Sequence, residues 1–576
     1  MGETPRSRGL SRRDFVRGVG VVGASGAIGF RFDPDQGGDP PGGGQQPTKP
    51  KQPTKPAKPK QPARKPPQRP NVVLIVADDM GFSDIGSFGA EIATPNLDRL
   101  AQTGTRFTGM LTNARCVPTR GSLLTGLYPT QVGLGYVTKN EGSPGYRGRL
   151  SDDCVTLGEV LEPSGYRTAL IGKWHVAQFK TGVIPATRGF ERSFGPTSGK
   201  SSYFEPNLYR DTRLIGRPSN PDFYMTEALT NEAVHTIRDF AESGAPFFTL
   251  LTYSAPHFPL QALARDIAKY RGTYGKGWDK IRAERFARLH KSGLIPGVDQ
   301  LPPRDAEAPP WKRASHHHWE ARRMQVYAAQ VTAMDRGVGQ VLAALDDLKI
   351  RDNTIVMFLS DNGASAERMG HGSAGSAVSG GKGPMRPGNF WRIAPGPSDT
   401  FASYGLAWAN ASNTPFSTFK HFMGEGGLAT PFLVSWPSRL PAGRIDHRLL
   451  HVTDLMPTLV DICDARYPSA RNGKRIPLPE GRSFAGAMGP RVVEDWTPSR
   501  RVYWEHEGNR AARHGWWKLV AEYAGAWELF NMREDRAEQH DLAATHPALV
   551  DKLSAGWSDW ANRVGVRPFL AGWQYR

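Results

Sequence analysis

Four short apolar runs, each followed at once by polar residues, constrain the fold of this 576-residue chain more than any other feature. The runs are rich in Val, Ile, Leu and Phe and occupy residues 72–76, 168–171, 247–251 and 355–359. Continuous runs of this kind are typical of strands that are buried on both faces, as in a parallel sheet covered by helices. Helical patterns lie between them, for example at residues 95–104 and 324–348. The sequence therefore predicts an α/β fold with a large, mainly parallel sheet.

Each run ends in side chains that can bind a ligand or take part in chemistry. In a parallel sheet the carboxyl ends of neighbouring strands meet at one edge, and ligands bind there. A single polar residue after a strand is usually only solvated, but four such groups together indicate one site. The side chains that would meet at this edge are Asp78, Asp79, Lys173, His175, His257, Asp361 and Asn362.

Part of this set offers oxygen ligands only, namely Asp78, Asp79, Asp361 and Asn362. Oxygen-only sets select hard divalent cations, and neither an EF-hand loop nor His and Cys at zinc spacing accompanies them. The pattern predicts bound Ca²⁺, with Mg²⁺ as the second choice. The alternative is structural, with the two aspartates capping a helix or pairing with Arg120.

A cysteine stands at a predicted helix start in the pentad Cys116-Val-Pro-Thr-Arg120. Proline is favoured in the first turn of a helix, and the N-terminal end of a helix attracts anions. Arg120 follows four residues later, so its guanidinium falls on the same helical face as the thiol. Thiol and cation together predict a catalytic centre. A buried structural cysteine is the competing interpretation.

The pentad resembles the maturation signature Cys-x-Pro-x-Arg of type I sulfatases, in which a formylglycine-generating enzyme oxidises the cysteine to formylglycine. The family usually has Ser or Ala where this chain has Thr119. Other matches, closest to bacterial arylsulfatases, are Gly172-Lys-Trp-His175, Ala255-Pro-His257 and Lys420-His-Phe-Met-Gly-Glu-Gly-Gly427. The likeness spans residues 71–542. It implies an alkaline-phosphatase-like sandwich, plus a smaller C-terminal subdomain built on an antiparallel sheet.

The resemblance implies a metal shell as well. In the family, calcium is held together with formylglycine, so the implied ligands are Asp78, Asp79, Asp361, Asn362 and converted Cys116. The hydrate of the aldehyde is the family's nucleophile. Physical chemistry agrees with this set, because a divalent ion lowers the pKa of a coordinated hydroxyl and neutralises charge on the substrate.

Further roles follow from the same resemblance. Arg120, Lys173 and Lys420 would surround the sulfate and stabilise charge that builds up on its oxygens. His257 would protonate the leaving alcohol or phenol. His175 would hydrogen-bond the aldehyde hydrate and help to expel sulfate.

The N-terminal tail is strongly basic and differs from the rest of the chain. Residues 1–70 hold 14 Lys/Arg against 5 Asp/Glu, which is half of the formal net charge of +18. Arg12 and Arg13 precede an apolar stretch too short to span a bilayer, which is typical of a twin-arginine export signal. Residues 31–70, rich in Pro, Lys, Gln and Gly, predict a spacer unable to fold alone. Residues 37–70 are either a solvated linker only, or a segment that contacts anionic polymers of the cell envelope.

These observations predict four parts: a twin-arginine signal segment at 1–30, a linker at 31–70, a catalytic domain at 71–464 and a C-terminal subdomain at 465–576. Export by the twin-arginine machinery predicts a periplasmic or extracellular protein, and retention at the membrane stays open. Outside the tail the positive charge is dilute and no nucleic-acid-binding motif accompanies it, so no nucleic-acid partner is expected.

The C-terminal part predicts short strands at 516–520 and 527–531 and a helix starting at Asp541. The string 505–511 either lines the mouth of the substrate site or turns a hairpin at Gly508.

Cysteine is scarce. The three cysteines, Cys116, Cys154 and Cys463, exclude a disulfide framework. One bridge between Cys154 and Cys463 stays open, although free buried thiols are the favoured state.

The combined prediction is an exported, calcium-dependent sulfatase. It would hydrolyse sulfate monoesters of small molecules or saccharides, such as aryl sulfates, to an alcohol or phenol and inorganic sulfate. Two alternatives remain open. One is a phosphonate monoester or phosphodiester hydrolase, which can share this fold and signature. The other is an envelope-binding protein with an inert body, in which residues 37–70 would be the active part.

Overall fold

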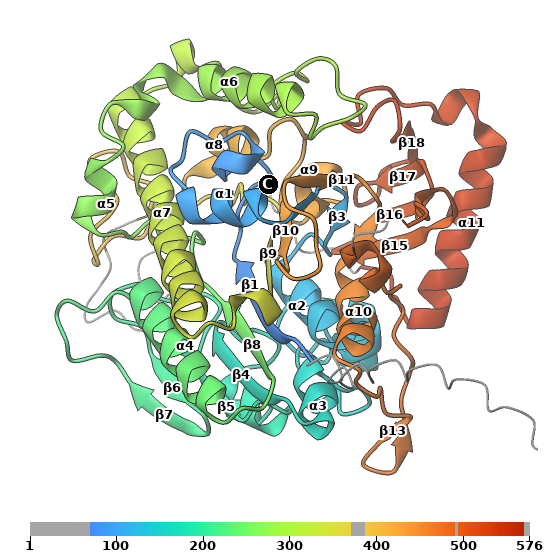
Figure 1. The fold of residues 1–576 in the computed structure, drawn as a ribbon. Coiled ribbons are helices and arrows are strands. Elements are labelled where there is room, and N and C mark those ends of the chain that lie inside the picture. The colour runs from blue at the N-terminus through green and yellow to red at the C-terminus, as the bar shows by residue number, and fades with distance from the viewer. Residues whose placement is uncertain (1–68, 370–385, 387, 490–492, 570–576) are drawn as a thin grey trace, which may run out of the picture. The chain divides into compact units, whose positions relative to one another are not determined.

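A central sheet of ten strands carries the fold of the described residues (Figure 1). The computed structural model describes residues 69–369, 386, 388–489 and 493–569, which all belong to one compact unit, Lys65–Arg576. The predicted signal segment at 1–30 lies outside the described residues, as does the predicted linker except for Arg69 and Pro70.

The sheet is parallel in its centre, and its pairings on both sides are antiparallel except between the two strands at one edge, which pair parallel. Its strands, in sheet order, are β11 (Arg444–Asp446), β2 (Thr105–Phe107), β10 (Phe432–Ser435), β9 (Thr354–Ser360), β1 (Asn71–Ala77), β8 (Phe247–Thr252), β4 (Arg167–Gly172), β5 (Arg192–Pro196), β6 (Leu208–Arg210) and β7 (Arg213–Gly216). The strands from β9 to β5 run parallel, whereas β10 and β6 join them antiparallel. The predicted α/β fold is confirmed, and the four apolar runs form the adjacent strands β9, β1, β8 and β4.

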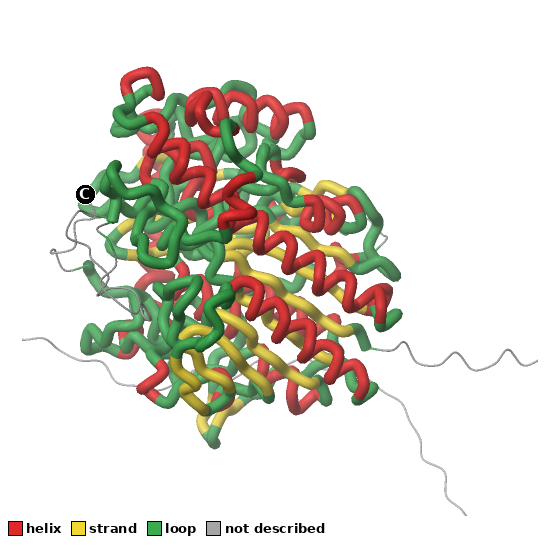
Figure 2. The backbone as a smooth tube through the Cα atoms, turned by 90° about the vertical axis from the view of Figure 1, so that its left-hand side faces the viewer, coloured by secondary structure: helices red, strands yellow, loops and turns green. Residues whose placement is uncertain are grey.

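Helices cover both faces of this sheet, because alternate residues of β1 enter two separate cores. Val73 and Ile75 pack in a core that includes residues of three helices, α1 (Pro95–Gln102), α4 (Met225–Glu242) and α7 (His317–Asp347). Val72, Leu74 and Val76 pack on the opposite face with α2 (Cys116–Thr125), α3 (Leu157–Leu161) and α10 (Leu455–Ile462). Figure 2 shows long helices lying over the strands, roughly along the direction of the strands. Each fully buried apolar side chain contributes about 1.5–3 kcal/mol.

A third core joins the chain segment after β8 to the first half of α7. It contains Trp278 of α6 (Gly277–Lys291) and Trp408 of α8 (Gly405–Ser412), whose rings meet edge to face at 5.5 Å. The short α5 (Ala264–Ala268) precedes α6. Helix α7 begins earlier than the predicted residue 324, because its first turns are held by polar contacts such as that of Arg323 with Glu320.

The C-terminal part forms the predicted antiparallel sheet. Its strands are β15 (Arg501–His506), β16 (Asn509–His514), β17 (Trp517–Ala521) and β18 (Glu528–Asn531). The terminal helix is α11 (Pro547–Val564), so the predicted helix start at Asp541 was wrong. The Asp541 carboxylate instead accepts the backbone N–H groups of Leu529 and Ala543, which ties the chain to β18 before the helix begins.

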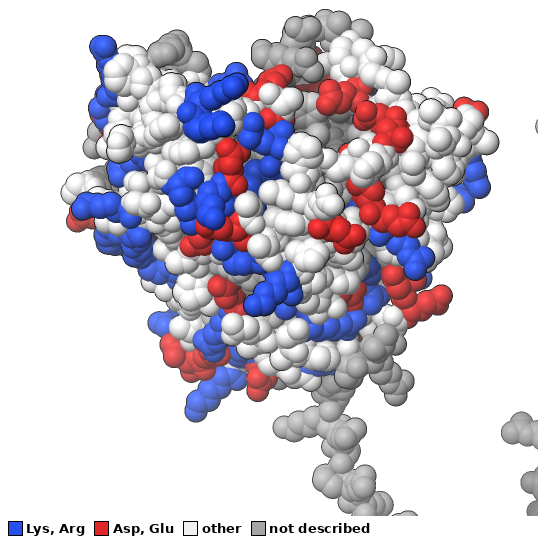
Figure 3. Space-filling view, turned by 90° about the horizontal axis from the view of Figure 1, so that it is seen from above, with Lys and Arg blue, Asp and Glu red and all other residues white. Residues whose placement is uncertain are grey.

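Smaller elements complete the described structure. They are the pairs β3 (Met110–Leu111) with β12 (Leu450–His451) and β13 (Ala470–Arg471) with β14 (Lys474–Arg475), and the short helix α9 (Glu425–Leu428). All three cysteines are free, so the bridge that stayed open between Cys154 and Cys463 is not formed. Within the described ranges, no helix combines the length and the apolar character needed to cross a bilayer. The face in Figure 3 intersperses lysine and arginine with aspartate and glutamate.

Candidate active site

The four adjacent strands β9, β1, β8 and β4 place their following residues at one edge of the sheet. Asp78 and Asp79 follow β1, and the Asp79 backbone N–H donates to the Asp361 carboxylate after β9 at 3.3 Å. Asp79 and His175 adopt left-handed φ angles of 64° and 51°. Such angles cost non-glycine residues about 1 kcal/mol or more, and they persist where surrounding contacts fix them. Surrounding contacts therefore hold the backbone at this edge in the conformation that presents these side chains.

The four predicted oxygen ligands lie together and are buried: Asp78, Asp79, Asp361 and Asn362. The Asn362 side-chain amide donates to Asp79 Oδ1 at 2.8 Å. Asn362 Oδ1 and Asp78 Oδ1 are buried and accept no hydrogen bond from the described residues. Buried oxygens without a donor are costly unless a cation satisfies them, so this set fits a hard divalent ion. Asp78, Asp79 and His257 also offer ligand atoms within 4.8 Å of one another.

Three cations neutralise the three carboxylates of this cluster. Arg120 binds Asp361 with Nη2 at 2.7 Å, Lys173 binds Asp78, and Lys420 Nζ lies 2.9 Å from Asp79 Oδ2. Arg120 also donates to the carbonyl of Lys173 at 2.8 Å. The structural alternative, in which the carboxylates pair with Arg120, is therefore present in part. Arg120 Nη2 lies 3.8 Å from Asp78 Oδ1, but its closer contact is with Asp361.

The pKa values of the two adjacent aspartates are shifted in opposite directions. Burial raises the pKa of Asp78 to about 8, although Lys173 opposes it. Burial acts in the same direction on Asp79, but Lys420 and His257 outweigh it and lower the pKa of Asp79 to about 2. A carboxyl held neutral in this way loses its proton when a cation binds beside it.

Cys116 is the first residue of α2, as the pentad predicted, and its side chain is almost fully buried. Burial raises the pKa of the thiol, against the opposing effects of Lys173 and Lys420. The neutral thiol is a poor nucleophile. The departure at Thr119 has a structural use, because its hydroxyl accepts the backbone N–H of Asn113 at 3.0 Å and so fixes the turn before the helix.

The pKa values of both predicted catalytic histidines are lowered, and His257 is buried whereas His175 is half-buried. Burial lowers the pKa of His257 to about 3, and its Nε2 lies 3.4 Å from Asp79 Oδ2. Burial and the charge of Lys173 lower the pKa of His175 far below its usual range. The His175 ring packs against the backbone of Gly199 so closely that a Cβ there would lie 2.1 Å from Nε2. Only glycine at 199 leaves room for this ring.

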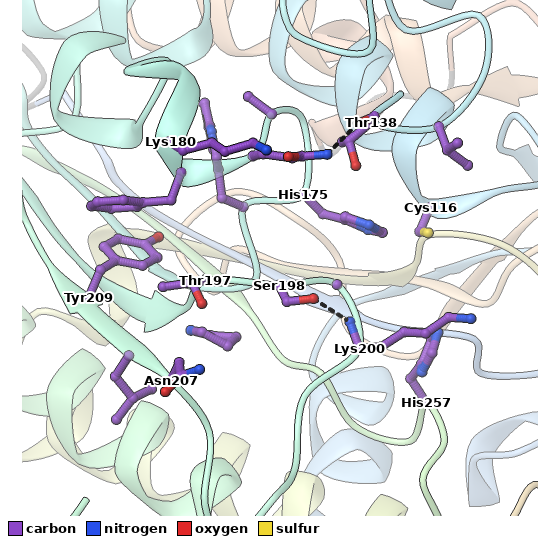
Figure 4. A pocket seen from close by; sticks show the side chains of 18 of the residues that line it. Cys116, Thr138, His175, Lys180, Thr197, Ser198, Lys200, Asn207, Tyr209 and His257 are labelled. Carbon is purple, nitrogen blue, oxygen red and sulfur yellow. Dashed lines mark hydrogen bonds between the residues drawn. The ribbon is translucent and has the colours of Figure 1, made fainter. Parts of the chain in front are cut away.

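A cavity of about 860 Å³ opens above the cluster (Figure 4). Four of the predicted catalytic residues line it: Cys116, His175, His257 and Lys420. Figure 4 shows Cys116 and His257 on one side of the cavity and Lys180 and Tyr209 on the other. Arg120 and Lys173 do not appear in this lining. They lie behind it, where they hold Asp361 and Asp78.

Further charged residues at the site were missed by sequence reasoning. Glu367 pairs with Lys420 Nζ at 3.1 Å, and Lys200 lines the cavity. Glu507 contacts Arg115, the residue before Cys116. Two of them carried some signal in the sequence: Arg115 lies beside the pentad, and Glu507 belongs to the string 505–511.

The string 505–511 forms a hairpin turn, which confirms one of its two interpretations. Glu507 and Gly508 both adopt left-handed φ angles, 55° and 81°, as the tightest antiparallel hairpins require. Glu507 does not line the cavity at Cys116, but it reaches the site through Arg115.

Known proteins resemble this chain over most of its length. The family model "Sulfatase" matches residues 70–465, and "N-sulphoglucosamine sulphohydrolase, C-terminal" matches residues 416–551. An uncharacterized sulfatase of Schizosaccharomyces pombe is 31% identical over 87% of this chain and 94% of its own length. The arylsulfatase of Klebsiella aerogenes is 33% identical, with 68% of this chain and 86% of its own covered.

The fold has relatives among solved structures as well. That of Ps i-CgsB in complex with k-i-k-neocarrahexaose matches with a TM-score of 0.62 and 25% identity, covering 86% of this chain and 93% of that one. The family match extends over the strands, the pentad and the oxygen cluster described above. This chain therefore belongs to the sulfatase family and is a sulfuric ester hydrolase.

Proposed function

We propose that the protein hydrolyses sulfate monoesters in the cavity at Cys116, using formylglycine made from that cysteine and a bound calcium ion. One observation carries the proposal. Cys116, His175, His257 and Lys420 meet in a single cavity, directly beside buried oxygen atoms that accept no hydrogen bond from the described residues. Hydrolase chemistry and an anionic substrate both suit this combination.

The implied groups fit the residues present. Asp78, Asp79, Asp361 and Asn362 would hold calcium, since carboxylate and amide oxygens are its preferred ligands. When bound, calcium offsets substrate charge and the hydrated aldehyde of formylglycine supplies a hydroxyl nucleophile. Mg²⁺ is the weaker candidate, because it usually retains several waters rather than an all-protein shell.

The protein's own residues supply charge and proton handling. Asp79 and Glu367 outweigh burial and raise the pKa of Lys420 well above its usual value, so this lysine is a permanent cation for the sulfuryl oxygens. His257 lies at the cavity wall and is proposed to protonate the leaving oxygen. His175, held against Gly199, is proposed to hydrogen-bond the nucleophile.

The proposed substrates are aryl sulfates or sulfated saccharides. The name of the Klebsiella relative points to aryl esters, and the neocarrahexaose ligand of Ps i-CgsB points to saccharides. The cavity volume of about 860 Å³ falls within the range of pockets that hold a ligand of several rings. A phosphonate monoester or phosphodiester substrate is the second candidate, because phosphate and sulfate are tetrahedral anions of similar size.

The test compares calcium-dependent turnover of one aryl sulfate with that of the matching aryl phosphate, using protein purified from its own source. Preference for the sulfate supports the proposal, and preference for the phosphate contradicts it. Peptide mass spectrometry checks whether Cys116 carries an aldehyde. Cys116→Ala serves as the inactive control, with an expected loss of more than about 10⁴-fold in kcat.

We also propose export by the twin-arginine route to the periplasm or beyond, after maturation by a formylglycine-generating enzyme. The paired Arg12 and Arg13 support it. Replacement of both by lysine should leave active protein in the cytoplasmic fraction. Deletion of residues 37–64 should preserve turnover. If the full chain shows no turnover and the deletion variant no longer associates with the envelope, the envelope-binding alternative is favoured.

A further inference from the structure

The cavity at Cys116 carries more positive charge than one sulfate group requires. Its lining residues include one carboxylate, that of Glu367, and four cationic side chains, those of Arg115, Lys180, Lys200 and Lys420. Lys420 is paired with Asp79 and Glu367, and Arg115 is paired with Glu507. These ion pairs account for Lys420 and Arg115, but not for Lys180 and Lys200, the other two cations that line the cavity.

Lys200 differs from an ordinary surface lysine. Its side chain is half-buried, and burial is the main cause that lowers the pKa of its ammonium group. The carboxylate with the largest effect on it is Glu367, which is already bound to Lys420. No ion pair within 4.0 Å involves Lys200 among the described residues. A half-buried ammonium group costs free energy, which a bound anion would offset.

Lys200 also lies close to Phe258 in the cavity. Its Nζ lies 5.1 Å from the ring centroid of Phe258, the residue that follows His257. His257 is the group proposed to protonate the leaving oxygen. Lys200 is therefore beside the part of the cavity that receives the leaving group, and Figure 4 shows it on the same side as His257 and Cys116.

The opposite end of the cavity has the features of a ring-binding wall. Phe179 and Tyr209 line it with their ring centroids 5.3 Å apart, and Lys180 follows Phe179 at the rim. Aromatic walls beside a cation suit a flat ring or sugar that carries an anionic substituent.

We infer that Lys200 is a specificity-determining residue that binds a second anionic group on the leaving-group side of the scissile ester. The substrate class is then a sulfate monoester whose alcohol or phenol carries a further carboxylate or sulfate. Lys180 at the rim would extend this preference to longer polyanionic leaving groups. The inference rests on the proposed sulfatase function.

The test uses two aryl sulfates that share one phenol ring, of which only one carries a carboxylate. For each variant, kcat/KM for the carboxylated ester is divided by kcat/KM for the plain ester. Comparing variants by this ratio removes the intrinsic reactivity of the two esters. Lys200→Met is expected to lower the ratio by roughly tenfold, mainly through KM, which is the scale of one hydrogen bond to a charged group.

Two further variants accompany it. Lys200→Arg keeps a cation and should restore most of the ratio. Lys291→Met, at the exposed end of α6, should leave the ratio at the wild-type value. Raising the ionic strength should lower the wild-type ratio and leave that of Lys200→Met nearly constant, because only the former depends on the added charge.

The outcomes separate the inference from the proposed function. If Lys200→Met lowers turnover of both esters equally, the lysine acts on the sulfuryl group itself and the inference is wrong, while the sulfatase function stands. An unchanged ratio with normal turnover also overturns the inference alone. If wild-type protein with a converted Cys116 hydrolyses neither ester, both the proposed function and the inference fall.

Discussion

His421 Nδ1 lies 2.7 Å from Glu507 Oε2, and this contact joins the loop that carries Lys420 to the hairpin between β15 and β16. The other oxygen of Glu507 binds Arg115, the residue before Cys116. One carboxylate of the C-terminal sheet therefore ties the loop that carries Lys420 to the start of α2, the helix that begins at Cys116. The C-terminal sheet therefore contacts residues of the candidate site directly.

Replacement of Glu507 by glutamine should lower both the free energy of unfolding and kcat. The variant removes the Glu507 charge from its buried ion pair with Arg115, and breaking one partner of a buried pair costs about 3–5 kcal/mol. Urea unfolding should show this loss, together with a lower kcat for an aryl sulfate. Glu534→Gln, at an exposed position, is the control and should stay within about 0.5 kcal/mol of wild type. Equal stability of both variants would contradict the role given to Glu507.

Asp335 should make stability depend on pH. Its carboxylate accepts the backbone N–H groups of Asn96 and Leu97 at the start of α1, yet burial raises its pKa to about 6 from 3.8. The folded protein then binds this proton more tightly than the unfolded chain. The stability due to the protonated form is complete below pH 3.8 and is lost as the pH rises through 6.

The measurement is the free energy of unfolding of wild type and Asp335→Asn across this range. The wild type should lose about 3 kcal/mol relative to the variant as the pH rises from about 3 to about 7, since each unit of pKa shift corresponds to about 1.4 kcal/mol. Other carboxyls titrate in both proteins and cancel in the difference. Parallel curves for the two proteins would show that Asp335 has no such effect.

Removal of a divalent ion should abolish activity and lower thermal stability together. Any ligand that binds only the folded state stabilises it, so a calcium chelator should lower the melting temperature, and added Ca²⁺ should restore it. Asn362→Ala removes one of the oxygens without a donor and should weaken this response. Metal content of the purified protein identifies the ion. A chelator that changes neither quantity would argue against the metal site.

Glycine at 199 should be required for the position of His175. A Cβ at this residue would lie 2.1 Å from His175 Nε2, so Gly199→Ala must displace the ring. A catalytic group moved by about 1 Å can cost roughly 10²-fold in rate, and the loss should appear in kcat. Gly275→Ala is the matched control, because no atom lies within 4 Å of its added Cβ. Equal activity of the two variants would remove His175 from the proposed mechanism.

Local sequence determined the central strands and the identity of most residues at the site. The runs that became β1, β4, β8 and β9 are read from short-range apolar patterning, and their polar successors Asp78, His175, His257 and Asp361 follow directly in the chain. A parallel arrangement of such strands is enough to bring these ends together. The helix start at Cys116 follows in the same way from its neighbours.

Tertiary structure decided which charges meet and in what state they are held. Arg115 and Glu507 are 392 positions apart, so no local pattern predicts their contact. Asp78 and Asp79 are neighbours with the same chemistry and are both buried, yet one pKa is raised and the other lowered, because the charged groups around each carboxylate differ. Lys200 carried no signal in the sequence, and only the packing of its loop against Phe258 places it in the cavity. Residue type fixes what a side chain can do, but its electrostatic environment depends on contacts that the fold alone creates.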